Sequence, residues 1–494
     1  MNYTRPTFVL IWLILISFFL TVSGSLFGRF AAATSDEETP VVLADMDPNV
    51  PERGDRPWFS PDYSNQENAL GYGAGAFAIL PGMEERVSFW IDIYSELTTD
   101  QGLLHDSRYV HIVYEKVDFT DIQVQTDLTD VQKVRARRKR VNEAKKVVTE
   151  RLHRLEKLSS PAGLDGEDLR YWYMFAKVDE KNKFKEASTK GRLRFQLGQK
   201  DRFLQGIHYS GRYLRQMERI FREAGLPIEL TRIPFVESSF NLKARSRAGA
   251  SGIWQFMRYT GRQFLKINWS VDERNDPIRA TEAAARLLKI NYGMLESWPL
   301  AVTAYNHGPA GMRRLVQKEQ TSNLVDLLDV RKGRFGFASA NFYASFLAAL
   351  EVEKNAKKYF KEPMWMAEHS REMIKLNRNV NHQGLLDIFG GDVEQARYFN
   401  PHVHSYVWRG WRVVREGNFI FVPPGEKEKS LARIDTLKDQ KPEVMDGEKY
   451  RVQRGDTLSD IAQRFGVTVR AIINANEISN PRALRAGQKI TIPK

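Results

Sequence analysis

From about residue 192 to residue 360, apolar residues recur every three or four positions, which is the spacing of buried faces on α-helices. Proline is favoured in the first turn of a helix, so we expect one helix to begin at Asp276-Pro277. The pattern predicts one compact α-helical domain over residues 192–360. Short turn signals interrupt it at Gly225-Leu226-Pro227, Asn275-Asp276-Pro277 and Gly308-Pro309.

The preceding region, residues 71–191, mixes helical and strand patterns. Val87–Leu97 has the periodicity of an amphipathic helix, and Tyr109–Phe119 alternates like a β-strand. A long helix should begin at Thr129, because Thr129 and Gln132 have the spacing of a capping box. Its run of Arg and Lys residues leaves nucleic-acid binding and a solvated helix face open, and the solvated face is favoured. We treat residues 71–191 as an N-terminal accessory region without an assigned role.

Smaller units follow the helical domain. Residues 376–424 contain a short helical pattern and then the alternating run Phe419–Val422, while the charged residues 425–449 predict a linker. Residues 450–494 predict a separate β-α-α-β unit, with Asp456 as the N-cap of its first helix. The predicted fold class is α+β multidomain, mainly α.

An internal repeat is indicated at the C-terminal end. One series of residues echoes another in the same order but at different spacing, which suggests that residues 376–424 are a degenerate second module. The two series are Leu385, Asn400, Pro423 and Leu458, Asn474, Pro493.

The N-terminus predicts export. Phe8–Leu20 is almost purely apolar and follows Arg5, which is typical of a signal peptide. The uncharged stretch continues to Gly28, which is long enough to span a bilayer. Residues 1–33 are interpreted as an export signal or a membrane anchor, and the sequence does not decide between cleavage and retention. Residues 34–70 are acidic and proline-rich and predict a linker.

Composition narrows the chemistry. The 494 residues include 74 Lys and Arg against 61 Asp and Glu, a net charge of +13, which favours a polyanionic partner. The absence of cysteine excludes disulfides, thiolate catalysis, Cys-ligated metals and lipidation through an N-terminal Cys. The acidic run Asp272–Asp276 lacks the spaced ligands and glycine of an EF-hand, so we interpret it as structural. No metal or cofactor is expected.

Glu237 is the candidate for acid catalysis. It is flanked by Phe235, Val236 and Phe240, and an apolar setting raises the pKa of a carboxyl group by disfavouring its ionised form. A carboxylic acid that is still protonated near neutral pH is suited to protonating a glycosidic oxygen. On these residues alone, a capping or salt-bridged Glu in a core helix is the favoured interpretation.

Several spaced segments change that balance. Glu237–Phe240, Ser246, Gly249–Met257 and Ala304–Gly308 occur in this order. Together they resemble the lytic transglycosylases of the soluble class, specifically the membrane-bound lytic murein transglycosylase D family with C-terminal LysM modules. The resemblance covers residues 192–348 closely and implies a lysozyme-like helical catalytic domain.

The resemblance assigns roles residue by residue. It implies that Glu237 is the single catalytic acid/base. Trp254 stands where many relatives carry Met or another apolar residue, which is expected to alter the wall of the cleft. The substrate-binding positions that the resemblance implies are Ser246, Gln255, Met257, Tyr305 and Asn306.

Structural roles compete with these assignments. Ser246 could cap a turn, Gln255 and Met257 could be ordinary helix packing, and Asn306 could end a helix before Gly308-Pro309. Taken together, these positions favour a substrate-binding role over a purely structural one.

The implied reaction cleaves the β-1,4 bond between MurNAc and GlcNAc and leaves a 1,6-anhydro-MurNAc end. No second carboxylate is evident near these segments. The resemblance implies that Glu237 acts first as the acid and then as the base. Two alternatives stay open: a lysozyme-type hydrolase in which water captures the intermediate, and a non-catalytic wall-binding protein.

The tail resembles a LysM module, which implies binding of N-acetylglucosamine chains. A protein-interaction unit is the alternative. The expected partner is peptidoglycan, nucleic acid is not expected, and the expected location is the periplasm or cell envelope. The glycan-binding positions that this resemblance implies are Gly455, Asp456, Thr457, Leu458, Ile478 and Asn480.

Overall fold

The protein is described by a computed structural model. It describes residues 77–328, 330, 335–442, 447–476, 478, 480–481 and 484–493, so the predicted export segment 1–33 and linker 34–70 lie outside it. Helices dominate the described residues, with three small sheets, which confirms the mainly α fold class. No helix in this part of the chain is long and apolar enough to cross a membrane.

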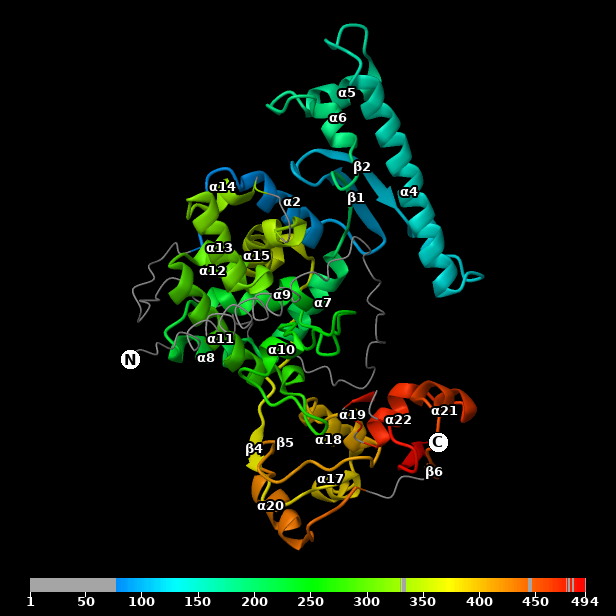
Figure 1. The fold of residues 1–494 in the computed structure, drawn as a ribbon. Helices are drawn as coiled ribbons and strands as arrows, with labels where there is room; N and C mark the ends of the chain where they lie inside the picture. The colour runs from blue at the N-terminus through cyan, green and yellow to red at the C-terminus, as the bar shows by residue number, and fades with distance from the viewer. Residues whose placement is uncertain are drawn as a thin grey trace, which may run out of the picture. The chain divides into compact units, whose positions relative to one another are not determined.

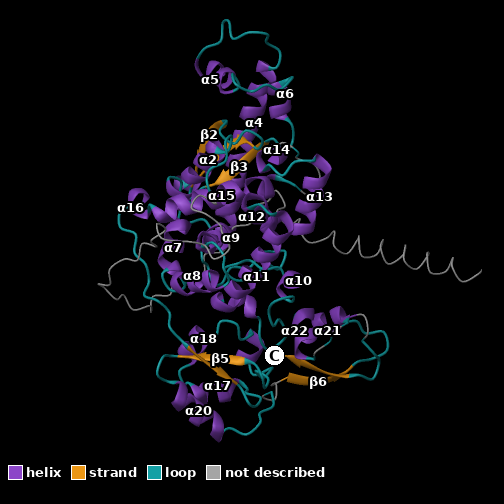
Figure 2. Ribbon diagram, turned by 90° about the vertical axis from the view of Figure 1, so that its left-hand side faces the viewer, coloured by secondary structure: helices purple, strands orange, loops and turns teal. Residues whose placement is uncertain are grey.

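The chain divides into two compact units. Among the described residues, one unit lies within 77–257 and 281–367, and the other lies within 258–280 and 368–493. In the first unit, helix α15 is a central helix, because residues 339–349 are buried all round and helices α2, α9 and α12 pack against it (Figures 1 and 2). The helices of this part are α2 (Glu84–Ser95), α7 (Lys200–Ser210), α8 (Leu214–Glu223), α9 (Ile233–Ser238), α11 (Pro277–Leu295), α12 (Trp298–His307), α13 (Pro309–Glu319), α14 (Leu324–Leu328), α15 (Phe337–Lys354) and α16 (Ala356–Tyr359).

Two predicted helix starts are confirmed. Helix α4 (Asp130–Leu155) begins after Thr129, whose hydroxyl accepts from the Gln132 N–H, while the Gln132 side chain accepts from the Thr129 N–H at 2.8 Å. Helix α11 begins at Pro277, and the Asp276 carboxylate accepts from the N–H groups two and three residues later. Both caps are local interactions, which is why the sequence predicts them.

Helix α2 comes from the region predicted to be accessory, yet it packs against α15 and α7. Its Val87, Phe89, Trp90, Ile93 and Tyr94 are all buried. The apolar face that predicted the helix is therefore covered by helices that follow residue 192 in the sequence.

The remainder of the described N-terminal region contains a three-stranded antiparallel sheet, in the order β2-β1-β3, and four helices. The predicted strand Tyr109–Phe119 is shorter than expected, because the Ile112 N–H donates to the Tyr109 carbonyl in a turn before β2. The elements are β1 (Gln101–Asp106), β2 (Val113–Asp118), α3 (Thr120–Gln123), α4, α5 (Gly166–Met174), α6 (Lys183–Ser188) and β3 (Leu193–Leu197).

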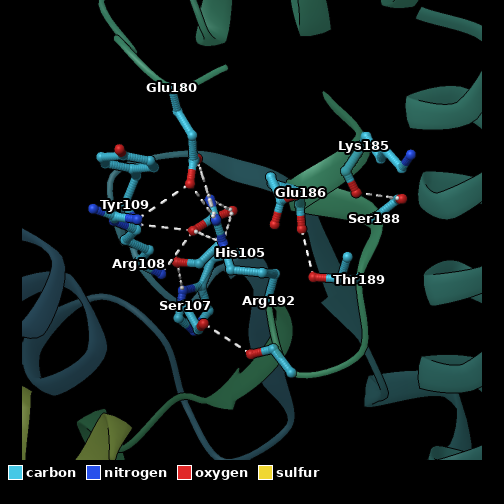
Figure 3. A network of polar contacts seen from close by, with 12 residues as sticks. His105, Ser107, Arg108, Tyr109, Glu180, Lys185, Glu186, Ser188, Thr189 and Arg192 are labelled. Carbon is cyan, nitrogen blue, oxygen red and sulfur yellow. Dashed lines mark hydrogen bonds and ion pairs between the residues drawn. The ribbon is translucent and has the colours of Figure 1, made fainter. Parts of the chain in front are cut away.

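A partly buried ion-pair network ties this sheet together (Figure 3). The Asp106 carboxylate is fully buried, 2.9 Å from a guanidinium nitrogen of Arg192, and it accepts the Arg108 N–H at 2.7 Å. Glu180 contacts both Arg108 and Arg192 at 3.1 and 3.2 Å. Because every charge is paired, the network joins the end of β1 to the start of β3 without leaving a lone buried charge.

The second unit contains two small α/β modules with separate cores. The predicted linker 425–449 is wrong over residues 427–436, which form helix α20 with Ile434 buried; its many charges lie on the exposed face and hide the apolar spacing. The elements before the tail are α10 (Arg258–Gly261), η3 (Glu273–Asn275), β4 (Glu372–Lys375), α17 (His382–Ile388), α18 (Val393–Phe399), α19 (Ser405–Trp408), β5 (Phe419–Val422) and α20 (Lys427–Thr436).

The tail forms the predicted β-α-α-β order, with β6 (Gly447–Arg451) antiparallel to β7 (Lys489–Pro493) and helices α21 (Leu458–Arg464) and α22 (Val469–Ala475) between them. The predicted N-cap Asp456 is wrong by one residue. Thr457 caps α21 in a capping box, whereas the Asp456 carboxylate accepts from the Tyr450 hydroxyl at 2.6 Å and the Gln453 N–H at 2.8 Å. Asp456 therefore fixes the loop rather than the helix end.

Candidate active site

Glu237 lies in the last turn of α9, a six-residue helix that ends abruptly. Ser239 and Phe240 follow it with φ angles of 49° and 55°, a left-handed conformation that is unusual for a residue as bulky as Phe240. The Ser238 hydroxyl donates to the Ile253 carbonyl at 2.8 Å. Such consecutive backbone strain is typical of functional sites and persists only where packing enforces it.

The packing around α9 supplies that support. Arg232, just before the helix, is fully buried and pairs with both Glu218 and Glu353. Phe235 stacks on the buried ring of Phe203 with centroids 4.7 Å apart. The ion-paired guanidinium before the helix and the aromatic stack of Phe235 hold the short helix that carries Glu237.

The electrostatic setting of Glu237 favours its neutral form. Burial raises the pKa of its carboxyl group to about 8, and loss of hydration is the whole cause. The residue is only partly accessible, and no described residue donates a hydrogen bond to its carboxylate. Nothing nearby therefore compensates the ionised form, and the acid remains protonated at neutral pH.

Tyr305 on α12 lies close to this acid. Burial, and secondly the charge of Glu237, raise the pKa of the Tyr305 phenol well above its ordinary value. Its hydroxyl donates to the Trp254 carbonyl at 2.8 Å, so its one proton is already used. The lone pairs of the Tyr305 oxygen can accept a hydrogen bond from a protonated Glu237, but the phenol cannot donate one to it.

Tyr94 on α2 is a residue that the sequence analysis missed. Burial raises the pKa of its phenol; a hydrogen bond with Ser345 of α15 lowers it, and the charge of Glu237 raises it further. Its ring packs on Phe203 with centroids 5.0 Å apart. The sequence marks Val87–Leu97 as amphipathic but does not indicate which buried aromatic would approach the acid.

Three predicted positions follow in the loop after α9. Gln255 has a φ of 46°, and its amide donates to the Gly252 carbonyl at 2.7 Å and to the Ala244 carbonyl at 3.2 Å. Met257 is half-buried. Ser246 is exposed, and its hydroxyl accepts the Ala250 N–H at 2.9 Å. Each of these contacts shapes the loop.

Trp254 differs from the expectation that it alters a cleft wall. Its side chain is fully buried, stacks on Phe221 and donates its indole N–H to Thr281 at 2.9 Å. The residue belongs to the core beneath Tyr305.

Asn306 has a donor to spare. Its side-chain oxygen accepts from the Ser339 hydroxyl at 2.8 Å, and among the described residues its amide nitrogen has no partner. The residue is half-buried. Its NH₂ group is therefore available to a ligand carbonyl or hydroxyl.

The acidic run 272–276 is structural, as predicted. Asp272 pairs with Arg274 at 2.7 Å, and Asp276 pairs with Arg371. Within the described ranges, no group of three or more metal-ligating side chains comes together.

Of the predicted glycan-binding positions in the tail, some belong to the core of the module and others lie in its loops or at a helix end. Leu458 is buried in the module core, and Ile478 packs against that core. Gly455 has a φ of 95°, which favours glycine, and Thr457 forms the cap of α21. Asn480 is exposed.

Comparison with known families places both modules. Residues 219–325 match the Transglycosylase SLT domain family, and residues 450–493 match the LysM domain family. Glu237, Tyr305 and Asn306 lie inside the first match, whereas Tyr94 lies outside it. The fold and the site thus define a protein with a transglycosylase SLT domain and a LysM domain.

The chain is also similar in sequence to individual proteins. Over 284 residues the chain is 28% identical to the membrane-bound lytic murein transglycosylase D of Escherichia coli K12, covering 55% of this chain and 61% of the relative. A putative tributyltin chloride resistance protein of Alteromonas is 32% identical over 106 residues, covering 21% of this chain and 51% of that protein. The Secreted LysM effector ECP6 of Passalora fulva is 47% identical over 45 residues, covering 9% and 20%.

The chain is a homologue of the membrane-bound lytic murein transglycosylase D. It spans less than two thirds of the length of that relative.

Proposed function

We propose that this protein is a peptidoglycan lytic transglycosylase that cleaves the β-1,4 bond between MurNAc and GlcNAc. The observation that carries the proposal is the raised pKa of Glu237, about 8, in a residue that lies within the range 219–325 matched by the SLT family. A single acid that is protonated at neutral pH and poised to lose its proton suits a reaction that needs one acid and one base in turn.

The first step uses the neutral acid. Glu237 donates its proton to the glycosidic oxygen, the C1–O bond breaks, and the GlcNAc unit leaves with its new hydroxyl group. The N-acetyl carbonyl of the MurNAc residue stabilises the positive charge that develops at C1. The protein then holds a carboxylate without hydrogen-bond donors among the described residues, which makes it a strong base.

The second step restores the acid. The Glu237 carboxylate takes the proton of the MurNAc C6 hydroxyl, and the C6 oxygen attacks C1 to close the 1,6-anhydro ring. No water is consumed and the proton returns to Glu237. The tethered hydroxyl benefits from its high effective concentration.

Neighbouring residues would position the sugar. We assign to Asn306 a hydrogen bond from its spare amide to an N-acetyl carbonyl, and to Tyr305 the orientation of the Glu237 proton. Gln255 and Met257 would line the glycan chain next to the acid, and Ser246 would contact it from the exposed loop.

The tail would hold the enzyme on its substrate. Its LysM match supports binding of N-acetylglucosamine chains through the first strand–helix loop and the last helix–strand loop. Homology to a membrane-bound murein enzyme supports a cell-envelope location. Export through residues 1–33, as a cleaved signal or as a retained membrane anchor, remains part of this proposal.

Digestion of purified sacculi tests the function. Wild-type protein should release muropeptides with 1,6-anhydro-MurNAc ends, identified by mass spectrometry, and the Glu237→Gln variant should release none above background. Reducing MurNAc ends alone would make the protein a lysozyme-type hydrolase. Equal release by wild type and Glu237→Gln would leave a wall-binding protein without catalysis by this residue.

A further inference from the structure

The region before the tail repeats the tail's structure. Residues 372–422 and 447–493 each contain a strand, two seven-residue helices and a returning antiparallel strand. Figure 1 shows β4 and β5 paired in one module, and Figure 2 shows the β6 strand and helices α21 and α22 in the other. From the first strand to the end of the second helix, the two modules align at a constant separation of 76 residues without a gap.

The strongest equivalence is an asparagine at the end of the second helix. Asn400 donates to the Ala396 carbonyl at 3.0 Å and to the Phe421 carbonyl at 2.9 Å, and accepts the Phe421 N–H at 2.8 Å. Asn476 makes the same three bonds, to Ile472 at 2.9 Å and to both backbone groups of Thr491 at 2.7 and 2.6 Å. In both modules one amide ties the helix end to the last strand.

The sheet register agrees with this equivalence. Phe421 pairs with Met373 across β4–β5, and Thr491 pairs with Lys449 across β6–β7. Met373 and Lys449 are themselves 76 residues apart. The sequence echo predicted for Asn400 was therefore correct in kind, but its partner is Asn476 rather than Asn474.

Local details of the two helices also correspond. Each helix in each module begins with a side chain that accepts an N–H from the first turn, and each first helix ends at a glycine with a φ near 65°. The equivalent pairs are Asn381 with Thr457, Asp392 with Thr468, Phe389 with Phe465, Gly390 with Gly466 and Val393 with Val469.

The modules differ at their loops. In the first module, the loop after β4 (residues 376–381) is covered by residues 437–441 of the same chain. The Asn379 N–H donates to Asp439 at 2.8 Å, the Asn381 N–H donates to the Gln440 side chain at 2.9 Å, and the Gln440 N–H donates to the Asn379 carbonyl at 3.0 Å. The backbone of this loop is therefore hydrogen-bonded to another segment of the same chain.

The last helix–strand loop of the first module also holds a chain segment. Asn400 and its strand partner are 21 residues apart, against 15 for Asn476, so this loop is six residues longer. The extra length binds residues 266–276 of the SLT match. The Asp272 N–H donates to the His402 carbonyl at 2.7 Å, and the His404 N–H donates to the Ser270 carbonyl at 2.8 Å.

A buried ion pair closes this second contact. The Arg371 guanidinium donates to the Asp276 carboxylate at 2.7 Å and lies 3.5 Å from the centroid of the Phe421 ring. The imidazole of His402 lies 4.0 Å from the same carboxylate. Arg371 precedes β4 and Asp276 caps α11, so the pair joins the module to a helix start of the SLT domain.

The tail module shows the contrast. The hydrogen bonds of its first loop, residues 452–457, all stay within the module: Val452 bonds with Gln488 and Gly487, and Gln453 and Tyr450 bond with Asp456. No other chain segment among the described residues covers the backbone of this loop.

We propose that residues 372–422 are a second LysM-type module whose two sugar-side loops bind segments of this chain in place of glycan. The first loop holds residues 437–441, and the second holds residues 266–276 of the transglycosylase domain. The module is thus a docking unit that fixes the SLT domain segment between the Gln255 loop and α11. The glycan part of this inference rests on the proposed wall-binding function of the tail.

Hydrogen–deuterium exchange on the full chain tests the proposal. The Glu237→Gln variant, which should not cleave its ligand, is measured with and without chitohexaose. Exchange in residues 376–381 and 402–404 should not change with the sugar, whereas residues 452–457 should slow. Slowing of 376–381 by chitohexaose would overturn the proposal. If neither loop responds, the proposed wall-binding function of the tail is contradicted. The docking claim is then decided by the variant with Asp439→Ala and Gln440→Ala.

A pair of variants tests the occupied loop without any sugar. Asp439→Ala with Gln440→Ala removes the contacts over residues 376–381 and should speed exchange there by about tenfold or more, because the Asn379 and Asn381 amides lose their acceptors. Lys438→Ala, on the same exposed segment, is the matched control and should have no effect. Equal exchange in both variants would contradict the docking claim.

Discussion

The phenolic oxygen of Tyr305 lies 2.8 Å from the backbone carbonyl oxygen of Trp254, to which it donates its only proton. The charge of Glu237 raises the pKa of the same phenol, which places the acid near it. The tyrosine therefore faces the acid as a hydrogen-bond acceptor. Burial keeps Glu237 neutral, and Tyr305 supplies no donor that would favour its carboxylate.

Replacing Tyr305 by Phe tests that role. The variant keeps the ring, which packs edge-to-face against Phe256 and stacks on Phe342, but removes the acceptor that orients the acid's proton. We expect kcat on sacculi to fall by about tenfold or more with little change in KM, since one oriented hydrogen bond is worth about 1–3 kcal/mol when its partner is left alone. Tyr359→Phe, which removes a surface bond to Glu351, is the control. A change in KM alone would contradict the orienting role.

The pKa of Glu237 also predicts a pH-dependent instability. Below about pH 4.5, the ordinary pKa, both folded and unfolded chains hold the proton and the residue has no effect. Between there and about pH 8 the unfolded chain releases the proton while the folded chain keeps it, so stability falls as pH rises.

The Glu237→Gln variant lacks this penalty. Its unfolding free energy, measured by urea denaturation, should exceed that of the wild type by an amount that grows from about pH 5 to about pH 8.5. One pKa unit corresponds to about 1.4 kcal/mol, so a difference on the order of a few kcal/mol is expected at the higher pH. A difference that is constant across this range would show that the carboxyl group is not desolvated.

The buried Arg232 should be essential to the fold around α9. Arg232→Leu leaves the Glu218 and Glu353 carboxylates buried without their cation. Removing one partner of a buried ion pair typically costs about 3–5 kcal/mol. We expect a loss of this size in urea unfolding of the unit that contains α9, whereas Arg222→Leu, at an exposed position of α8, should change stability by less than about 0.5 kcal/mol. Similar small losses in both would mean that the pair is not desolvated.

The asparagine at the end of α22 should hold the tail module together. Asn476→Ala removes three hydrogen bonds that tie α22 to β7 in a module with a small core. Exchange of the β7 amides should approach that of an unfolded segment, and binding to sacculi should fall severalfold. Unchanged exchange in β7 would show that the clamp is dispensable.

The sequence predicted local features well. The Thr129 capping box and the Asp276 helix start were predicted because each depends on residues within one turn of the helix. The approach of Tyr94 to Glu237 could not be predicted, because it depends on α2 packing against α15 across some 250 residues of sequence. Helix α20 was missed because its charged face masks the spacing of its few buried positions.

Candidate site residues show the same division. The apolar neighbours of Glu237 predicted a raised pKa, and burial is the cause found. The same kind of reasoning did not predict that the Gln255 amide would bond to its own loop, or that Trp254 would be core. Those outcomes depend on the left-handed backbone at Gln255 and on the Phe221 stack, which no spacing in the sequence reveals.

The central claim is that Glu237 is a desolvated acid that stays neutral at physiological pH. The most direct test is a carbon NMR titration of protein labelled with ¹³C at the glutamate carboxyl groups, with the Glu237 signal assigned by its loss in Glu237→Gln. The account predicts that this signal titrates with a pKa of about 8. A midpoint near 4.5, the ordinary value for the group, would contradict it.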